Sequence, residues 1–111
     1  MSRYRMYYCD FERDTEIIAD GAEPREVDEI LSMMDQVLHG PGNFLGIMDA
    51  HGGMLQFLVD DDGRIGVEIP DPPRRGHYGK HASLAECKAL LQAADGRFHW
   101  DSVDGLTFEK W

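Results

Sequence analysis

Two histidines, His77 and His81, stand four residues apart, the spacing that places two zinc ligands on one face of a helix. Gly76 and Gly79 oppose a helix in this stretch, and no glutamate completes an H-E-x-x-H motif. Cys87 offers a third ligand, but the set matches no zinc signature. We therefore expect no bound metal and interpret both histidines as surface residues of a loop.

The stretch LVDDDGRIGVEI, Leu58–Ile69, sets three aspartates and a glycine among apolar residues. A calcium loop needs glycine at its sixth position and a bidentate glutamate at its twelfth. With Gly63 in sixth place, leucine occupies the first position and isoleucine the twelfth, so the essential ligands are missing. Asp62-Gly63 is instead a strong hairpin signal, and we predict a turn whose aspartates form an acidic protrusion.

The sequence holds no set of residues for nucleophilic or phosphate chemistry. Ser83 begins the S-x-x-E pattern of a helix cap and does not lie in a G-x-S-x-G elbow. Cys9 and Cys87 occupy apolar positions, which favours a buried thiol pair over a disulfide scaffold. The segment GPGNFLG, residues 40–46, lacks the lysine of a P-loop. We therefore predict that the chain is not an enzyme and needs no cofactor.

Charge is the strongest signal of the composition, because 21 acidic and 11 basic side chains give a formal charge of −10. Residues 10–35 hold ten acids and two bases, whereas residues 64–88 hold three acids and five bases. Such a surface repels nucleic acids and anionic membranes, so we expect neither as a partner. The charge either serves solubility alone or attracts a basic protein.

The chain length bounds the organisation of the protein. With 111 residues, of which 42% are apolar, residues 1–111 are expected to form a single domain. No apolar run approaches the roughly 20 residues that span a bilayer, and the start MSRYRMYYCDF lacks the apolar block of a secretory signal. We therefore expect a soluble, cytoplasmic protein.

The first half of the chain predicts a strand and a helix. Residues 3–11 are rich in aromatic side chains and read as a strand, followed by a connection over residues 12–22. A helix is predicted from Pro24 to Leu38, where Gly40 and Pro41 end it. Its buried positions follow a spacing of about 3.6 residues: Val27, Ile30, Leu31, Met34, Val37 and Leu38. The acids of this helix must therefore face solvent or a partner.

The second half predicts a meander and a second helix. Strands are expected over residues 43–49, 54–60 and 64–69, and a last strand in the tail, residues 98–111. Residues 70–82 contain three prolines and two glycines and predict an exposed, partly stiffened loop. The second helix has a buried stripe behind its Ser83/Glu86 capping box: Leu84, Cys87, Leu90, Leu91 and Ala94. The predicted fold is α+β, an antiparallel sheet of about five strands with two helices packed on one face, in the order β-α-β-β-β-α-β.

Aromatic residues divide into two groups. Those in the predicted strands and the tail are expected in the core and in cross-strand pairs: Tyr4, Tyr7, Tyr8, Phe11, Phe44, Phe57 and Phe98. Tyr78 lies in the predicted loop beside Arg74, Arg75 and His77, a composition typical of an interface hot spot. A loop tyrosine also often folds back onto its own domain, so both interpretations stand.

The second half of the chain resembles a known family. A meander, a loop with glycine and proline, and the segment ASLAECKALLQAADGRFHW followed by LTFEKW resemble the end of small bacterial immunity proteins that neutralise polymorphic toxins. The matching residues are Ser83–Ala94, Gly96 and Trp111 within residues 43–111. The resemblance implies a non-enzymatic cytoplasmic inhibitor that is encoded with a toxin and occludes its active site or a neighbouring surface.

The leading hypothesis is thus an immunity or inhibitor protein that binds a cognate toxin through the toxin's basic surface. The candidate contact residues are Glu26, Asp28, Glu29, Asp35, Asp60, Asp61, Asp62, Arg74, Arg75, His77 and Tyr78. A self-associating structural or regulatory domain, for example a homodimer, is the alternative. A small ligand-binding domain or enzyme that uses residues 70–82, with His77 or His81 as its base, is the least favoured hypothesis.

Overall fold

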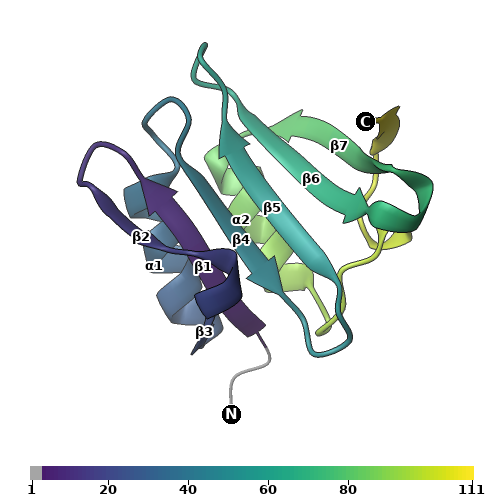
Figure 1. Ribbon diagram of the computed structural model, residues 1–111, viewed down its shortest axis with the longest axis horizontal. Coiled ribbons are helices and arrows are strands. Elements are labelled where there is room, and N and C mark those ends of the chain that lie inside the picture. Colours follow the sequence, from purple (N-terminus) through teal and green to yellow (C-terminus); the bar gives the residue numbers. More distant parts are fainter. Residues whose placement is uncertain (1–3) are drawn as a thin grey trace.

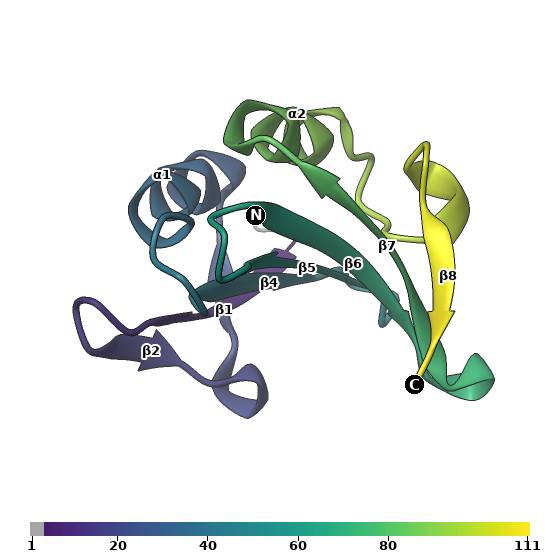
Figure 2. The same ribbon diagram turned by 90° about the horizontal axis from the view of Figure 1, so that it is seen from above.

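The computed structural model describes residues 4–111 as two layers, an antiparallel sheet and a pair of helices on one of its faces (Figures 1 and 2). The helices are α1 (Val27–Val37) and α2 (Leu84–Ala93). The strands of these residues are β1 (Tyr4–Asp10), β2 (Thr15–Ile17), β3 (Glu23–Arg25), β4 (Phe44–Met48), β5 (Met54–Val59), β6 (Ile65–Asp71), β7 (Gly76–Ala82) and β8 (Thr107–Lys110). Their order across the sheet is β2-β1-β4-β5-β6-β7-β8, and β3 pairs with β1. The predicted α+β class is confirmed, but the sheet has eight strands within residues 4–111, where about five were predicted.

The N-terminal part differs from the prediction in two places. The predicted connection, residues 12–22, contains β2 and a short 3-10 helix, η1 (Ala19–Gly21). The predicted helix start at Pro24 is wrong, because this proline lies in β3. Strand β3 is an edge strand that pairs only with β1, and an edge strand tolerates a proline because its other side needs no backbone N–H for strand pairing. Helix α1 begins after Glu26, whose side chain forms a capping box with Glu29. Arg3, where the first strand was predicted to begin, lies outside the described residues.

The predicted loop over residues 70–82 is also wrong, because most of it forms a hairpin. Strand β6 continues to Asp71, and β7 pairs with it from Gly76 onward across the short 3-10 helix η2 (Pro72–Arg74). The two prolines of η2 lie in the turn, where no ladder hydrogen bond is lost. At Gly76 an added Cβ would overlap Phe108 and the backbone of β8, so this glycine permits strand pairing. The histidines of this segment therefore lie in a strand.

The core fills the space between the sheet and the helices. Its most deeply buried side chains, each 0–1% exposed, come from both layers: Met6, Leu45, Ile47, Leu55, Phe57, Val59, Val67, Ile30, Met34, Val37, Cys87 and Leu91. Burying a side chain of this size contributes roughly 1.5–3 kcal/mol. The predicted buried thiols are confirmed, since Cys9 and Cys87 are both free and buried. Phe11 was expected in the core, but it is 64% exposed because it follows the last residue of β1.

Within residues 4–111, neither helix is long and apolar enough to cross a membrane; the longer one, α1, has 11 residues.

Candidate interaction surface

One face of the sheet is covered by neither α1 nor α2, and we call it the open face; on this side the short η1 lies over β1 (Figures 1 and 2). Figure 2 shows the two ends of the sheet, the β2 region and the β6–β7 tip, curving away from the helices on the same side, so this face is concave. Side chains alternate across a strand, so the residues opposite the core form this face. Strand by strand they are Arg5, Tyr7 and Cys9; Glu16; Pro24; Phe44, Gly46 and Met48; Met54, Gln56 and Leu58; Gly66, Glu68 and Pro70; His77, Gly79 and His81; and Thr107 and Glu109.

Tyr7 fixes the centre of the open face. It pairs with Gly46 on β4, and its ring lies over that glycine so closely that an added Cβ would overlap the ring. The Tyr7 hydroxyl donates to Gln56 Oε1 at 2.7 Å and lies 3.1 Å from Met54 Sδ. Burial, and then the negative charge of Glu68, raises the pKa of the Tyr7 phenol to about 12. The ring is thus a neutral, rigid platform across three strands.

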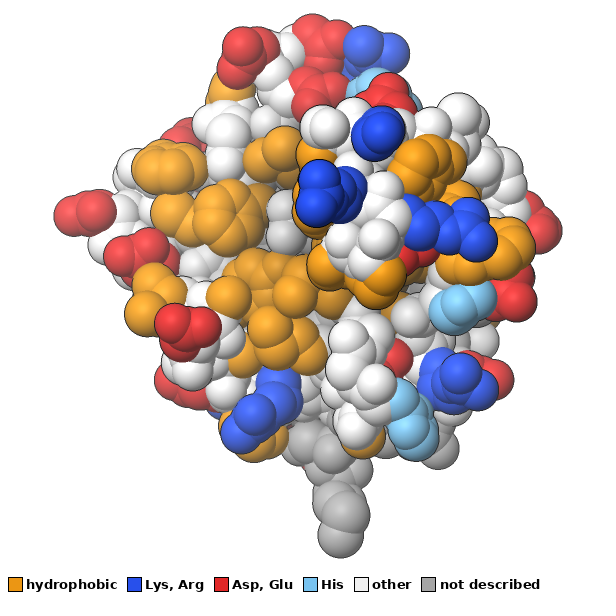
Figure 3. All heavy atoms as spheres, turned by 45° about the vertical axis from the view of Figure 1, so that its right-hand side comes forward, with side chains coloured by type: hydrophobic (Ala, Val, Ile, Leu, Met, Phe, Trp, Pro, Cys, Tyr) orange, Lys and Arg blue, Asp and Glu red, His pale blue; other side chains and the backbone are white. Residues whose placement is uncertain are grey.

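Half-buried apolar side chains surround Tyr7. Phe44 meets the Tyr7 ring edge-on, with ring centroids 6.3 Å apart, and Met48, Met54 and Leu58 extend the apolar area over β4 and β5. Figure 3 shows hydrophobic side chains gathered over this part of the open face. A contiguous apolar patch on a protein surface is typical of an interaction site, and methionine adapts readily to a partner's shape.

The other half of the open face, over β6, β7 and β8, is polar and hollow. A depression of about 390 Å³ lies here, and Gly66 and Gly79 leave its floor without side chains. Its remaining lining residues are Asp60, Val67, Glu68, His77, Lys80, His81, Thr107 and Glu109. Three carboxylates therefore line a depression that directly adjoins the apolar patch.

Two histidines are held in this depression by hydrogen bonds. The indole N–H of Trp111 donates to His77 Nδ1 at 3.0 Å, and because an indole only donates, Nδ1 must accept. The proton of the neutral ring is then on Nε2, which lies 3.5 Å from Glu109 Oε2 and 3.8 Å from Glu68 Oε2. His81 Nε2 lies 2.7 Å from Asp60 Oδ2. Within residues 4–111 no group of three or more His, Cys, Asp or Glu side chains is arranged to hold a metal ion.

The predicted contact acids of the first helix lie in the helix layer, away from the open face. The side chains of Glu26 and Glu29 form the capping box of α1. Asp35 pairs with Lys88 of α2, with its Oδ2 3.0 Å from Nζ, and Asp28 is exposed in the first turn of α1. These carboxylates are accessible, but they face a different direction from the apolar patch.

The predicted aspartate protrusion is the β5–β6 turn at one end of the sheet. Gly63 has φ 85°, which confirms the hairpin turn expected from Asp62-Gly63. Asp62 accepts from the backbone N–H and the guanidinium of Arg64, and these hydrogen bonds lower the pKa of its carboxyl. Asp60 borders the depression of the open face, and Asp61 is exposed. This turn therefore extends the acidic rim of the open face.

Arg74 and Arg75 lie at the opposite end of β6. Arg74 Nη1 donates to the hydroxyl of Tyr78 at 2.8 Å, and Arg75 caps η2 in the left-handed conformation. Tyr78 is 8% exposed and stacks on Trp100 with ring centroids 5.3 Å apart. Tyr78 therefore folds back onto its own domain, and an exposed hot spot at this residue is wrong. Of the predicted contact residues, His77 lies within the open face and Asp60 lies at its rim.

Sequence reasoning missed the apolar patch. Its residues were assigned to ordinary strands, and periodicity alone does not tell which face of a sheet remains uncovered. The available signal was Gly46, because a glycine inside an apolar strand indicates that another group approaches the backbone closely.

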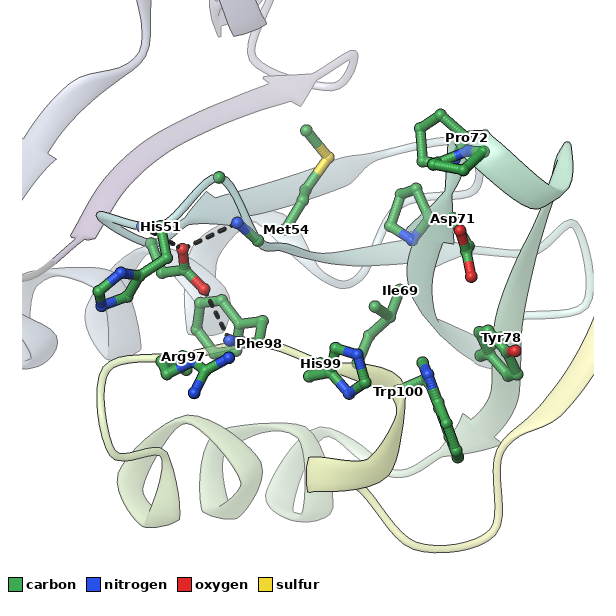
Figure 4. Close-up of a pocket in the computed structure, with 15 residues that line it drawn as sticks. His51, Met54, Ile69, Asp71, Pro72, Tyr78, Arg97, Phe98, His99 and Trp100 are labelled. Carbon is green, nitrogen blue, oxygen red and sulfur yellow. Dashed lines mark hydrogen bonds between the residues drawn. The ribbon is translucent and has the colours of Figure 1, made fainter.

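A second hollow, the end cavity, opens where the β4–β5 turn meets the C-terminal segment (Figure 4). Its volume is about 350 Å³. The Asp49 carboxylate joins the two segments by accepting from the backbone N–H groups of His51 at 2.7 Å, Gly53 at 2.8 Å and Phe98 at 2.7 Å. Burial alone would raise the pKa of the Asp49 carboxyl, but these three donors outweigh it and hold the pKa below its ordinary value.

Comparison with known proteins gives one partial similarity to report. A mouse protein described as 17S U2 SnRNP complex component HTATSF1 is 30% identical over 91 residues, which is 82% of this chain and 11% of the mouse protein. The chain thus spans about a tenth of the length of that relative. No family model matches the chain, and no solved structure matches it.

Proposed function

We propose that this chain is a non-enzymatic inhibitor of the immunity type, which binds a toxin domain with a basic surface and works in the cytoplasm. The observation that carries the proposal is the open face, on which an apolar patch adjoins a depression rimmed by carboxylates. Docking on this face would use the patch for affinity and the carboxylates for orientation.

The charge of the whole chain supports the same proposal. A formal charge of −10 accelerates the encounter with a basic partner, and the carboxylates of the open face can pair with its lysines and arginines. Glu16, Glu68 and Glu109 lie on this face around the apolar side chains. A toxin that acts on nucleic acid would present such a basic surface, because its own substrate is anionic.

A growth assay tests the proposal. The product of the gene adjacent to the one for this chain is expressed from an inducible promoter, alone or together with the chain. We expect the product to stop growth and the chain to restore it. Failure of the chain to restore growth, or an adjacent product without toxicity, would contradict the proposal.

Two matched variants connect protection to the open face. Met48→Lys places a positive charge in the apolar patch, and Ser32→Lys places the same charge on the exposed side of α1. We expect Met48→Lys to lose protection and Ser32→Lys to keep it, with urea unfolding used to confirm that both variants are folded. Equal protection by the two variants would exclude docking at the patch.

Self-association is the second candidate function, and the edge strand β8 favours it. β8 lies at one end of the sheet order, and Phe108 and Trp111 are 38% and 66% exposed. An exposed edge with aromatic side chains is a template for pairing with a second copy. Light scattering of the purified chain separates the candidates, because a stable dimer without a second protein would favour self-association.

A further inference from the structure

We propose that the end cavity is a binding site for a monoanionic carboxylate carried on a flat apolar body. This inference rests on the cavity alone and does not depend on the proposed function. The volume of about 350 Å³ lies within the range of roughly 300–1,000 Å³ that is usual for small-molecule sites.

Three segments that are distant in the sequence form the walls of the cavity. The β4–β5 turn contributes Asp49 and residues 51–54, the β6–η2 junction contributes residues 69–73, and the C-terminal segment contributes residues 97–100. The Asp49 hydrogen bonds to Gly53 and Phe98 tie the first wall to the third. A site built from tied segments is formed before the ligand arrives, which lowers the entropic cost of binding.

The apolar side of the cavity is ordered by ring stacking. Trp100 stacks on Tyr78, with centroids 5.3 Å apart and an angle of 20° between the ring planes, and Tyr78 in turn contacts Phe108 at 5.0 Å. Ile69 and three prolines complete this side of the lining. A flat apolar group fits between such surfaces, because aromatic and proline rings offer rigid contact area.

Arg97 supplies the guanidinium in the lining of the cavity, and the two aspartates that line it already have partners. The Asp49 carboxylate already accepts three backbone N–H groups, and Asp71 lies 3.8 Å from the guanidinium of Arg74. Arg97 has no hydrogen bond or ion pair within the part of the chain that the structure describes. Figure 4 shows His51, Arg97 and His99 along one side of the cavity, across from Pro72 and Tyr78. An incoming anion would therefore pair with the guanidinium of Arg97.

The surrounding acids select a single negative charge. Asp95 and Asp101 line a neighbouring depression that also includes Arg97, and they would repel a dianion such as a phosphate monoester about twice as strongly as a monoanion. One guanidinium fork matches one carboxylate, with two parallel N–H to oxygen hydrogen bonds. The free acid of a small aromatic molecule and the C-terminal carboxylate of a peptide both supply this chemistry.

The test follows the indole N–H signal of Trp100 in ¹H–¹⁵N spectra while 2-naphthoate is added to the full chain. The Trp111→Phe variant assigns the signal, because it leaves Trp100 as the only tryptophan. We expect a saturable shift of this signal and of the backbone amides in the three walls. The neutral analogue 2-naphthamide should bind about tenfold more weakly, because it loses the charge-assisted pair with Arg97. The dianion 2-naphthyl phosphate should also bind about tenfold more weakly, because Asp95 and Asp101 repel its second charge.

Two substitutions decide the role of Arg97. Arg97→Gln should weaken naphthoate binding about tenfold. Arg75→Gln removes a nearby guanidinium that does not line the cavity and should leave binding unchanged. Absence of a saturable shift, equal binding of the amide, or equal binding by Arg97→Gln in a folded protein would overturn the proposal.

A second titration identifies the source of the carboxylate. Acetyl-alanyl-phenylalanine with a free C-terminus is compared with its amide and with 2-naphthoate. Tighter binding of the peptide acid than of naphthoate points to a protein terminus, and the reverse points to a free aromatic acid. Either result supports the carboxylate site, and equal binding of peptide acid and peptide amide contradicts it.

Discussion

At the residue scale, Tyr7 and Gly46 show how one pair of side chains shapes the open face. The Tyr7 ring takes the space that a Cβ at position 46 would occupy, and its hydroxyl continues to Gln56 on the next strand. Aromatic cover of a strand glycine fixes the register of both strands. The centre of the proposed docking surface is therefore part of the folded scaffold and does not form only when a partner binds.

Gly46→Ala tests this arrangement. The added methyl group must displace the Tyr7 ring, so we expect a loss of about 1–3 kcal/mol in the free energy of unfolding. Gly66→Ala is the matched control on the same face, since its Cβ would meet only the Leu58 carbonyl oxygen at 3.7 Å, an ordinary contact. Urea denaturation of both variants measures the difference. Equal stability of the two variants would contradict the packing described for Tyr7.

Asp49→Asn tests the carboxylate that joins the β4–β5 turn to the C-terminal segment at the end cavity. An amide in this position loses the charge-assisted hydrogen bonds to His51, Gly53 and Phe98, and we expect a cost of about 1–3 kcal/mol at neutral pH. Because folding lowers the pKa of this carboxyl, its stabilisation is complete above the unfolded pKa of about 4 and is lost as the pH falls through the folded pKa. Urea midpoints at several pH values should therefore converge for wild type and variant in acid. A gap that stays constant with pH would refute this role.

At the element scale, the parts with local signals could be predicted and the parts that depend on distant pairing could not. The cap of α2 was predicted because Ser83 and Glu86 are three residues apart, and the turn at Gly63 because its signal is a dipeptide. Strand β7 was missed because Gly76 and Gly79 normally interrupt strands, and only the close approach of neighbouring strands explains them. The edge strands β2 and β3 have three residues each, too few for a periodic pattern.

Ser83→Ala tests the predicted start of α2. The Ser83 hydroxyl accepts from the backbone N–H of Glu86 at 3.1 Å, and Glu86 Oε1 accepts from the backbone N–H of Ser83 at 3.0 Å. Loss of the cap should cost about 1 kcal/mol in the free energy of unfolding. Ser83→Asp keeps a capping oxygen and should retain most of the stability. If Ser83→Asp is as unstable as Ser83→Ala in thermal unfolding, the capping role is wrong.

At the scale of the whole molecule, the two faces of the sheet differ in what covers them. The helices cover one face of the sheet and complete the core, and the bowed opposite face remains accessible (Figure 2). The acidic and apolar side chains of the open face come from strands that are far apart in the sequence, so no single sequence motif predicts this surface. Of the contact residues predicted from local composition, His77 lies in the open face and Asp60 at its rim, and the others are distributed over the helix layer and both ends of the sheet.

Acidic side chains lie both on the open face and in the helix layer, and their positions predict different effects on the rates of association and dissociation. The rate of binding to the adjacent gene's product should fall at least about tenfold as salt rises, because screening weakens electrostatic steering. Glu16→Gln with Glu68→Gln on the open face should reduce the dissociation half-life of the complex. Asp28→Asn with Asp35→Asn in the helix layer should change only the association rate. Stopped-flow and dissociation kinetics separate the two effects, and identical behaviour of the two double variants would contradict docking on the open face.

If a partner docks on the apolar patch of the open face, a lysine placed in the patch must weaken binding, and the equilibrium dissociation constants of two lysine variants measure this effect. Leu58→Lys charges the patch, and Ala89→Lys adds the same charge to the exposed side of α2. Against the adjacent gene's product, we expect Leu58→Lys to bind at least about thirtyfold more weakly, a loss of about 2 kcal/mol, and Ala89→Lys to bind like the wild type. Equal affinity of a folded Leu58→Lys variant and the wild type would show that the partner does not dock on the apolar patch.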